Sequence, residues 1–319
     1  MSEQLPRGYV CCRAEAPIAI DGRLNKPAWG AAPWTADFRD IQGDLRPNPP
    51  LRTRAKMLWD DEYLYIGAEM DEPHVWATLT EHDSVVYQDP DFEVFIDPDG
   101  DNHEYYEIEI NALNTEWDLR LVKPYRDGGP ALNEWEIPGL KTAVHVDGTL
   151  NDPSDRDRGW SVELALPWTV LGEFANRPAP PAHGDQWRIN FSRVEWHVEI
   201  VDGRYVKIPG RAEENWVWSP QGLIDMHQPE RWGYVQFSTL PPGQDAFRRD
   251  PNERARDALM RLYHAQRAFQ KANGRWAASL TELGLPADAA PEIGLTADGY
   301  KAALGAWRVR QDSRLWREG

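Results

Sequence analysis

DFEVFIDPDGDNHEYYEIEINAL, residues 91–113, is the stretch that decides the fold. Residues 91–98 and 103–113 each read as a β-strand, and GDNHE (100–104) between them is typical of a tight turn. Alternation is plain in the second strand, where successive side chains point to opposite faces. One face holds Tyr105, Glu107, Glu109 and Asn111, and the other holds Tyr106, Ile108, Ile110 and Ala112. The stretch therefore predicts a strand pair with an apolar face and a face rich in carboxylates.

Similar runs recur along residues 9–238. The clearest further strands are 53–60, 63–70, 115–122, 140–148, 159–168, 185–196, 214–219 and 232–238. Only 20–33 and 166–174 look like short helical turns. Many short strands with regular turns and few helices indicate a mainly β fold. We expect an antiparallel two-sheet β-sandwich of the immunoglobulin or jelly-roll kind.

The pattern changes after a Pro- and Gly-containing segment, residues 239–250. Asp250 is expected to cap a helix with Pro251 in its first turn, and Gly274 is expected to end it. SLTELG (279–284) repeats this pattern in miniature, and two short strands follow. The predicted parts are a β-sandwich over 1–238, a linker over 239–250 and a small α+β extension over 251–319.

The composition excludes several classes of partner. The formal net charge is -17, which argues against nucleic acid and anionic membranes. No run of 18 apolar residues is present, so no membrane span is expected. The first residues lack the basic and apolar regions of a secretory signal. The chain is therefore expected to be cytoplasmic if Met1 is the native start, and secreted or periplasmic if a leader has been removed. The oligomeric state is left open.

The chain has two cysteines, Cys11 and Cys12, and they are adjacent in the sequence. On a strand their side chains point to opposite faces, and a disulfide between neighbours is strained. Free thiols are expected, with a vicinal redox or metal pair as the alternative.

Sixteen tryptophans stand in the chain, many beside carboxylates and amides in strand-like runs. Examples are Trp117 in NTEWDL and Trp196 in RVEWH. An aromatic face with directional hydrogen-bonding groups beside it suits a sugar ring, which is apolar on one face and hydroxylated at its edges. Burial in the core is the alternative for each tryptophan.

A series of segments resembles the family 9 carbohydrate-binding modules and their DOMON-like relatives. The segments are IDGRLNKPAW (20–29), AKMLWDDEYLYIGAEM (55–70), DFEVFIDPDG (91–100), GWSVELALPW (159–168), QWRINFSRVEW (186–196) and WSPQGLIDMHQPERWGYVQF (218–237). The resemblance implies a two-sheet β-sandwich with bound calcium. It also implies a slot at one sheet in which two aromatic side chains sandwich a terminal sugar.

The resemblance places the slot on particular residues. The first aromatic wall falls near Tyr87, and the ligand-binding carboxylate falls on Glu93. The family's arginine falls on Glu109, which reverses the charge, and its glutamine falls on Ser192. Its second tryptophan falls near Met226, with His227 adjacent. The sequence thus keeps part of the family's sugar slot.

Strand parity adds two further candidates for ligand contact, Asn111 and Trp196. Asn111 shares a face with Glu109, and Asn190, Ser192 and Trp196 can share one face of the strand 187–196. For Trp196, which stands near the strand end, stacking on a ligand and burial in the core are both open.

The run DPDGDNHE offers closely spaced oxygen ligands on Asp97, Asp99, Asp101 and Asn102, which suits calcium. A polar turn without metal is the alternative.

Three functions remain open from the sequence. The first is a carbohydrate-binding module without catalysis. The second is a glycosidase that uses Glu93 and Glu109 as paired carboxylates. The third is an interaction module whose sugar slot is vestigial. The tail segment YHAQRAFQKANGRWAASLTELG (263–284) resembles pilin-like segments, and a plain helical unit is its alternative.

Overall fold

The computed structural model of the chain describes residues 5–286 and 291–318. Most strands of this part belong to one continuous sheet. From edge to edge it runs β8 (Ala131–Leu132), β7 (Glu116–Leu121), β6 (Tyr105–Asn111), β5 (Asp91–Asp97), β11 (Gln186–Glu195), β15 (Gly233–Ser238), β1 (Gly8–Arg13), β3 (Thr53–Trp59), β4 (Tyr63–Asp71), β10 (Gly159–Pro167) and β9 (Lys141–Asp147), while β14 (Glu214–Val217) pairs with β11 and with β2 (Arg39–Asp40).

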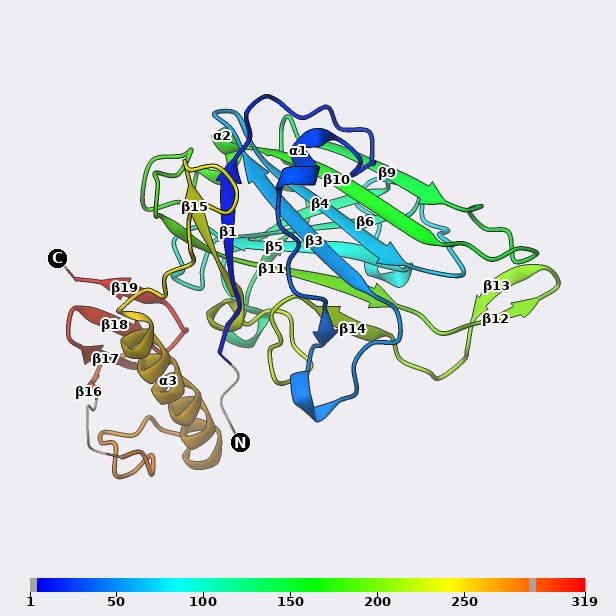
Figure 1. Ribbon diagram of the computed structural model, residues 1–319. Helices are drawn as coiled ribbons and strands as arrows, with labels where there is room; N and C mark the ends of the chain where they lie inside the picture. Colours follow the sequence, from blue (N-terminus) through cyan, green and yellow to red (C-terminus); the bar gives the residue numbers. More distant parts are fainter. Residues whose placement is uncertain (1–4, 287–290, 319) are drawn as a thin grey trace.

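The sheet curls so that its two halves face each other as the layers of a sandwich. In Figure 1, β3, β4 and β10 lie across β5, β6 and β11. The main core between the layers contains alternate residues of both halves, such as Ile66 and Leu164 from one and Val94, Ile108 and Phe191 from the other. Burial of these apolar faces is the main force that holds the layers together. The predicted mainly β sandwich is confirmed.

Strand β1 connects the two layers. It pairs in parallel with β15 along Gly8–Cys12 and with β3 only through Cys12 and Arg13. The sheet is therefore mixed here. Cys11 lies in the main core, whereas Cys12 lies in a second cluster under the short helix α1 (Pro27–Ala31). Both thiols are free and buried, on opposite faces of the strand as the sequence predicts.

The ten strands predicted for residues 53–238 are all present, with ends shifted by one or two residues. The helical turn expected at 166–174 appears as α2 (Trp168–Leu171). A hairpin of β12 (Val198–Val201) and β13 (Arg204–Lys207) was not predicted. Single 3-10 turns interrupt the loops at η1 (Gly43–Leu45), η2 (Val86–Gln88), η3 (Tyr125–Asp127) and η4 (Pro229–Arg231).

The C-terminal extension packs its helix α3 (Glu253–Asn273) on its own small antiparallel sheet (Figure 1). That sheet consists of β16 (Glu292–Leu295), β17 (Tyr300–Leu304), β18 (Trp307–Arg310) and β19 (Leu315–Arg317). The helix ends at Gly274 as predicted, but the predicted cap at Asp250 is wrong. Residues 251–252 form a turn, and the carboxylate of Asp250 accepts the backbone N–H of Asn252 instead. Residues 281–284 form a turn rather than the small second helix.

Polar contacts join the extension to the sandwich. Arg126 donates to Glu230 at 2.9 Å and to the hydroxyl of Tyr263 on α3, and that hydroxyl donates to Asp127. Because the apolar face of α3 is used within the extension, this contact depends on charge and hydrogen bonds. The division at residues 239–250 stays a prediction about independent folding.

Candidate functional site

A pocket of about 600 Å³ lies on the outer face of the layer formed by β5, β6, β7, β11 and β14. The ladder places Ser192, Glu93, Glu109 and Trp117 in one row across β11, β5, β6 and β7. The apolar face of the same strands points into the core. The alternation seen in the sequence therefore sends the carboxylates outward to form the floor of the pocket.

Three buried glutamates form that floor. Glu93 and Glu107 are each 5% exposed and Glu109 is 2% exposed. Burial raises the pKa of Glu93 to about 7 and raises the pKa values of Glu107 and Glu109 well above the usual range for a carboxyl. Glu213 and Asp225 stand at the sides, and no lysine or arginine is among the described lining residues. The pocket therefore holds closely spaced acidic groups without a basic side chain among the described lining residues, in a partly dehydrated space that disfavours their charged forms.

Aromatic side chains form two walls above the floor. On one side the rings of Tyr87 and Trp117 lie 6.4 Å apart with planes inclined by 31°. On the other side Tyr125 stands edge-on to His227, with ring centroids 4.5 Å apart. Tyr87 is 40% exposed and Tyr125 is 51% exposed, so much of each side chain is accessible in the pocket lining.

His227 is a neutral part of the second wall. Burial lowers the pKa of its imidazole to about 4. Its Nδ1 lies 3.0 Å from the hydroxyl of Tyr105, and Arg126 donates to its backbone carbonyl. These contacts fix the wall in place, and they supply no positive charge to the pocket.

The structure brings together five of the eight residues that the sequence assigned to ligand contact. Tyr87, Glu93, Glu109, Met226 and His227 all line the pocket. Ser192 lies directly opposite Glu93 in the ladder and is fully buried below the lining.

Asn111 and Trp196 are used for other contacts. The amide of Asn111 donates to the backbone carbonyl of Leu79 and to Asp89. The indole of Trp196 donates to the backbone carbonyl of Tyr87 at 2.8 Å, and Lys207 covers its ring at 3.6 Å. Trp196 thus supports the wall residue Tyr87 from behind.

Glu107, Trp117 and Tyr125 also line the pocket but were not assigned to it from the sequence. The signal for Glu107 was present, since it shares a strand face with Glu109. Trp117 stands across from Glu109 in the next strand. This neighbour relation could be found only from the strand register, which the sequence pattern does not give. Tyr125 comes from the turn η3, for which no periodic pattern exists.

The loop after β5 gathers the predicted calcium ligands. Asp97, Asp99 and Asp101 each offer an oxygen within 4.8 Å of the others. Burial and the charges of Asp99 and Asp101 raise the pKa of Asp97 well above its usual range. Asn102 donates its amide N–H to the backbone carbonyl of Ser313 in the extension, a contact that does not use the Oδ1 atom with which it would bind a metal. The three carboxylates therefore fit a hard cation, whereas the amide nitrogen of Asn102 holds the extension.

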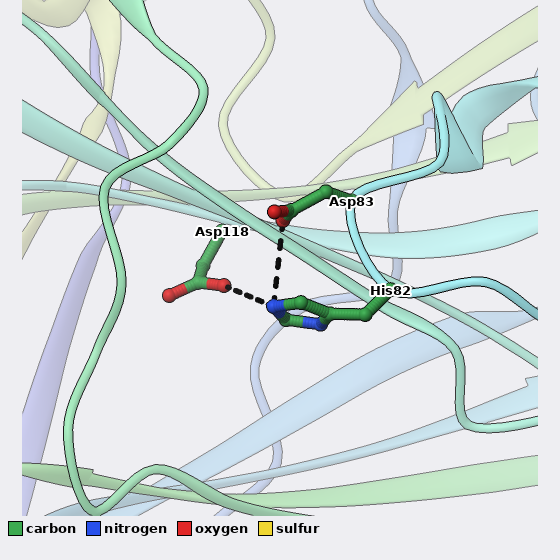
Figure 2. A group of neighbouring side chains, drawn as sticks. All are labelled: His82, Asp83 and Asp118. Carbon is green, nitrogen blue, oxygen red and sulfur yellow. Dashed lines mark ion pairs between the residues drawn. The ribbon is translucent and has the colours of Figure 1, made fainter.

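A third acidic group has its own counter-charge (Figure 2). Nε2 of His82 lies 3.5 Å from Asp83 and 3.8 Å from the buried Asp118, and Glu136 lies 3.2 Å away. Burial lowers the pKa of His82, but the hydrogen bond to Glu136 and the neighbouring carboxylates outweigh this and raise it overall. The imidazole therefore offers these carboxylates a positive partner from within the chain.

Comparison with known proteins places the chain in a family. Residues 20–189, more than half of the chain, match the family described as "Carbohydrate family 9 binding domain-like". An exoglucanase, XynX, from Acetivibrio thermocellus is 29% identical over 117 residues, which are 37% of this chain and 9% of that protein. Endo-1,4-beta-xylanase A from Thermoanaerobacterium saccharolyticum is 28% identical over 116 residues, 36% of this chain and 8% of that protein. The chain therefore matches less than a tenth of the length of either relative.

One solved structure supports the fold. A protein from Bacteroides uniformis described as carbohydrate-binding superposes with a TM-score of 0.53 at 16% identity, over 73% of this chain and all of the other. Within the described residues, no helix has the length and apolar character needed to cross a membrane. On the match over residues 20–189, this chain belongs to the family 9 carbohydrate-binding domains.

Proposed function

We propose that the outer-face pocket binds a saccharide ring between its two aromatic walls. The observation that carries the proposal is the combination of the accessible side chains of Tyr87 and Tyr125 with a floor of glutamates, in a domain of a carbohydrate-binding family. Aromatic faces accept the apolar face of a sugar, and carboxylate oxygens accept hydrogen bonds from its hydroxyls. The volume of about 600 Å³ is within the range of small-ligand sites.

The geometry favours binding over bond cleavage. Glu93 and Glu109 pair directly on adjacent strands, so both carboxyls rise from the same floor. A glycosidase holds its two carboxyls about 5 to 9.5 Å apart, flanking the scissile bond. Carboxylates that both lie under the ligand can hold its hydroxyls but cannot flank a bond. We therefore propose a non-catalytic role for this pair.

The proposal is tested by titration calorimetry of the full chain against a panel of mono- and oligosaccharides at fixed calcium. Analysis of products in the same samples separates binding from hydrolysis. Heat of binding with no released sugar is the expected result. Released sugar that is lost in Glu93→Gln would instead support the glycosidase. A full panel without any heat, in a folded protein, would support the interaction module with a vestigial slot.

We also propose that Asp97, Asp99 and Asp101 hold a structural calcium ion. The support is the three oxygens within 4.8 Å and the burial of Asp97 at the end of β5. Calcium takes six to eight oxygen ligands at 2.3–2.6 Å, so water or backbone carbonyls would complete the shell. The ion would stiffen the turn between β5 and β6, the strands that carry the pocket floor.

A further inference from the structure

A second set of three carboxylates lies in the floor of the pocket. Asp91, Glu93 and Glu109 each offer one oxygen, and these oxygens all lie within 4.8 Å of one another. The three side chains are 0%, 5% and 2% exposed. Asp91 and Glu93 stand two apart on one face of β5, and Glu109 pairs directly with Glu93 on β6. The sheet itself therefore holds three acids together.

These acids are only partly satisfied by the protein. Oδ2 of Asp91 is buried and has no hydrogen-bond partner in the described part of the chain, and the carboxyl of Glu93 has beside it only the hydroxyl of Ser192, its partner in the ladder. Oδ1 of Asp91 accepts the backbone N–H of Val194, and Oε2 of Glu109 accepts that of Tyr87. Burying a carboxylate without a partner is costly, so such a group in a native protein requires an explanation.

Two other clusters with buried acids in this protein contain a side chain that can carry positive charge. On the opposite face of β11, Nη2 of Arg193 lies 2.6 Å from Glu72 and 2.7 Å from Glu195. The carboxylates around His82 lie close to its imidazole, which can form ion pairs with them (Figure 2). The pocket floor has no lysine or arginine among its described lining residues. An external positive charge would balance the floor in the way that Arg193 balances the other face.

We propose that Asp91, Glu93 and Glu109 bind a divalent cation of the calcium class, which is open to the pocket and can coordinate a saccharide hydroxyl. Oxygen ligands of calcium lie 2.3–2.6 Å from the ion, so two ligands of one ion are at most about 5 Å apart. The spacing of the three oxygens meets this limit without any movement. Only the last step, contact with the saccharide, rests on the proposed function.

A bare ion fits the floor better than the ammonium group of an amino sugar. Asp91 is fully buried and does not contribute to the pocket lining, whereas Glu93, Glu107 and Glu109 do. An ammonium group carried on a sugar ring would reach the lining glutamates and leave Asp91 unbalanced. An ion without a bulky substituent reaches all three oxygens at once.

The site is tested first in the wild-type full chain. Crystals stripped with chelator and soaked in Mn²⁺ or Tb³⁺ are expected to show an anomalous-scattering peak between the three carboxylates. No peak there, with a peak at the loop of Asp97, would overturn the proposal. Calorimetry with Ca²⁺ then compares wild type with Glu93→Gln and the matched control Glu199→Gln, an exposed glutamate of β12 outside the pocket lining. We expect one fewer bound ion in Glu93→Gln only, and equal stoichiometry in all three proteins would contradict the site.

The link to saccharide is tested separately. Removing the ion from the floor is expected to weaken saccharide binding about tenfold or more, as for loss of a charge-assisted contact. Unchanged saccharide affinity in chelator would show that the ion does not contact the ligand. If glucosamine binds in the presence of chelator, and the floor binds no ion when both glucosamine and chelator are absent, the ammonium group is the occupant and the proposal is overturned. Cation binding without any saccharide binding would leave the site standing and remove the proposed function.

Discussion

Tyr87→Ala is expected to weaken saccharide binding about five- to thirty-fold while the sandwich stays folded. A tyrosine side chain offers on the order of 200 Å², and Tyr87 is 40% exposed, which leaves about 80 Å² free. A sugar ring covers one face of the ring, about half of this area. At about 25 cal/mol per Å², counted on both the ring and the sugar, the contact contributes about 2 kcal/mol at most.

The fold is expected to tolerate the change because the contact that Tyr87 makes with the floor uses its backbone. The backbone N–H of Tyr87 donates to Glu109 at 2.8 Å, and its carbonyl accepts the indole N–H of Trp196. Alanine keeps both groups. The wall loses its ring, and its neighbour Trp117 gains exposure.

The assay is titration calorimetry at fixed calcium, with thermal melting to check the fold. Tyr87→Phe keeps the ring and should bind nearly as wild type does. Tyr205→Ala, in the hairpin of β12 and β13, is the matched control because it removes a partly exposed tyrosine outside the pocket lining. A dissociation constant for Tyr87→Ala equal to that of the wild type, for a sugar that the wild type clearly binds, would remove Tyr87 from the site and refute the reasoning.

Three other outcomes are expected. Calcium should raise the melting temperature by mass action, and Asp99→Ala combined with Asp101→Ala should reduce that shift. Identical melting curves of the wild type in calcium and in chelator would show that the loop is a polar turn without a metal. His82→Gln should lower the free energy of unfolding at about pH 6 and change it little at about pH 8.5. A raised folded-state pKa contributes stability below the unfolded pKa of about 6.5, and this stability is lost as the pH rises through the folded-state pKa. Urea denaturation at the two pH values should show a loss under about 1 kcal/mol, since the group is half-exposed, and the opposite pH trend would count against the ion pairs. A chain that ends at Ser238 should fold and keep its saccharide affinity, since α3 packs on its own sheet; an insoluble product or a non-cooperative melt would show that the extension is part of one folding unit.

Much of the sandwich could be predicted because burial imposes a period of two on each strand. The apolar residues at Ile108 and Ile110 point into the core, which forces Glu107 and Glu109 outward. The hairpin at 198–207 also carried a signal, the Asp202–Gly203 pair. Both residues have positive φ, 48° and 73°, which suits the two-residue turn that Asp-Gly favours.

The walls of the pocket were harder to predict because loops carry them. Tyr125 reaches the pocket from η3, and His227 reaches it from the segment before η4. Such segments have no period from which a facing direction follows. Trp196 shows a related limit: it follows the last residue of β11, so strand parity no longer governs its side chain. Its indole turns to the backbone of Tyr87 instead.

The most direct measurement for the central claim is a crystal structure of the full chain with the saccharide that the calorimetric panel identifies. A ring is expected in the outer-face pocket, with one face against Tyr87 or Tyr125 and its hydroxyls toward Glu93 and Glu109. A saccharide bound at saturating concentration anywhere else on the molecule, with this pocket empty, would contradict the account.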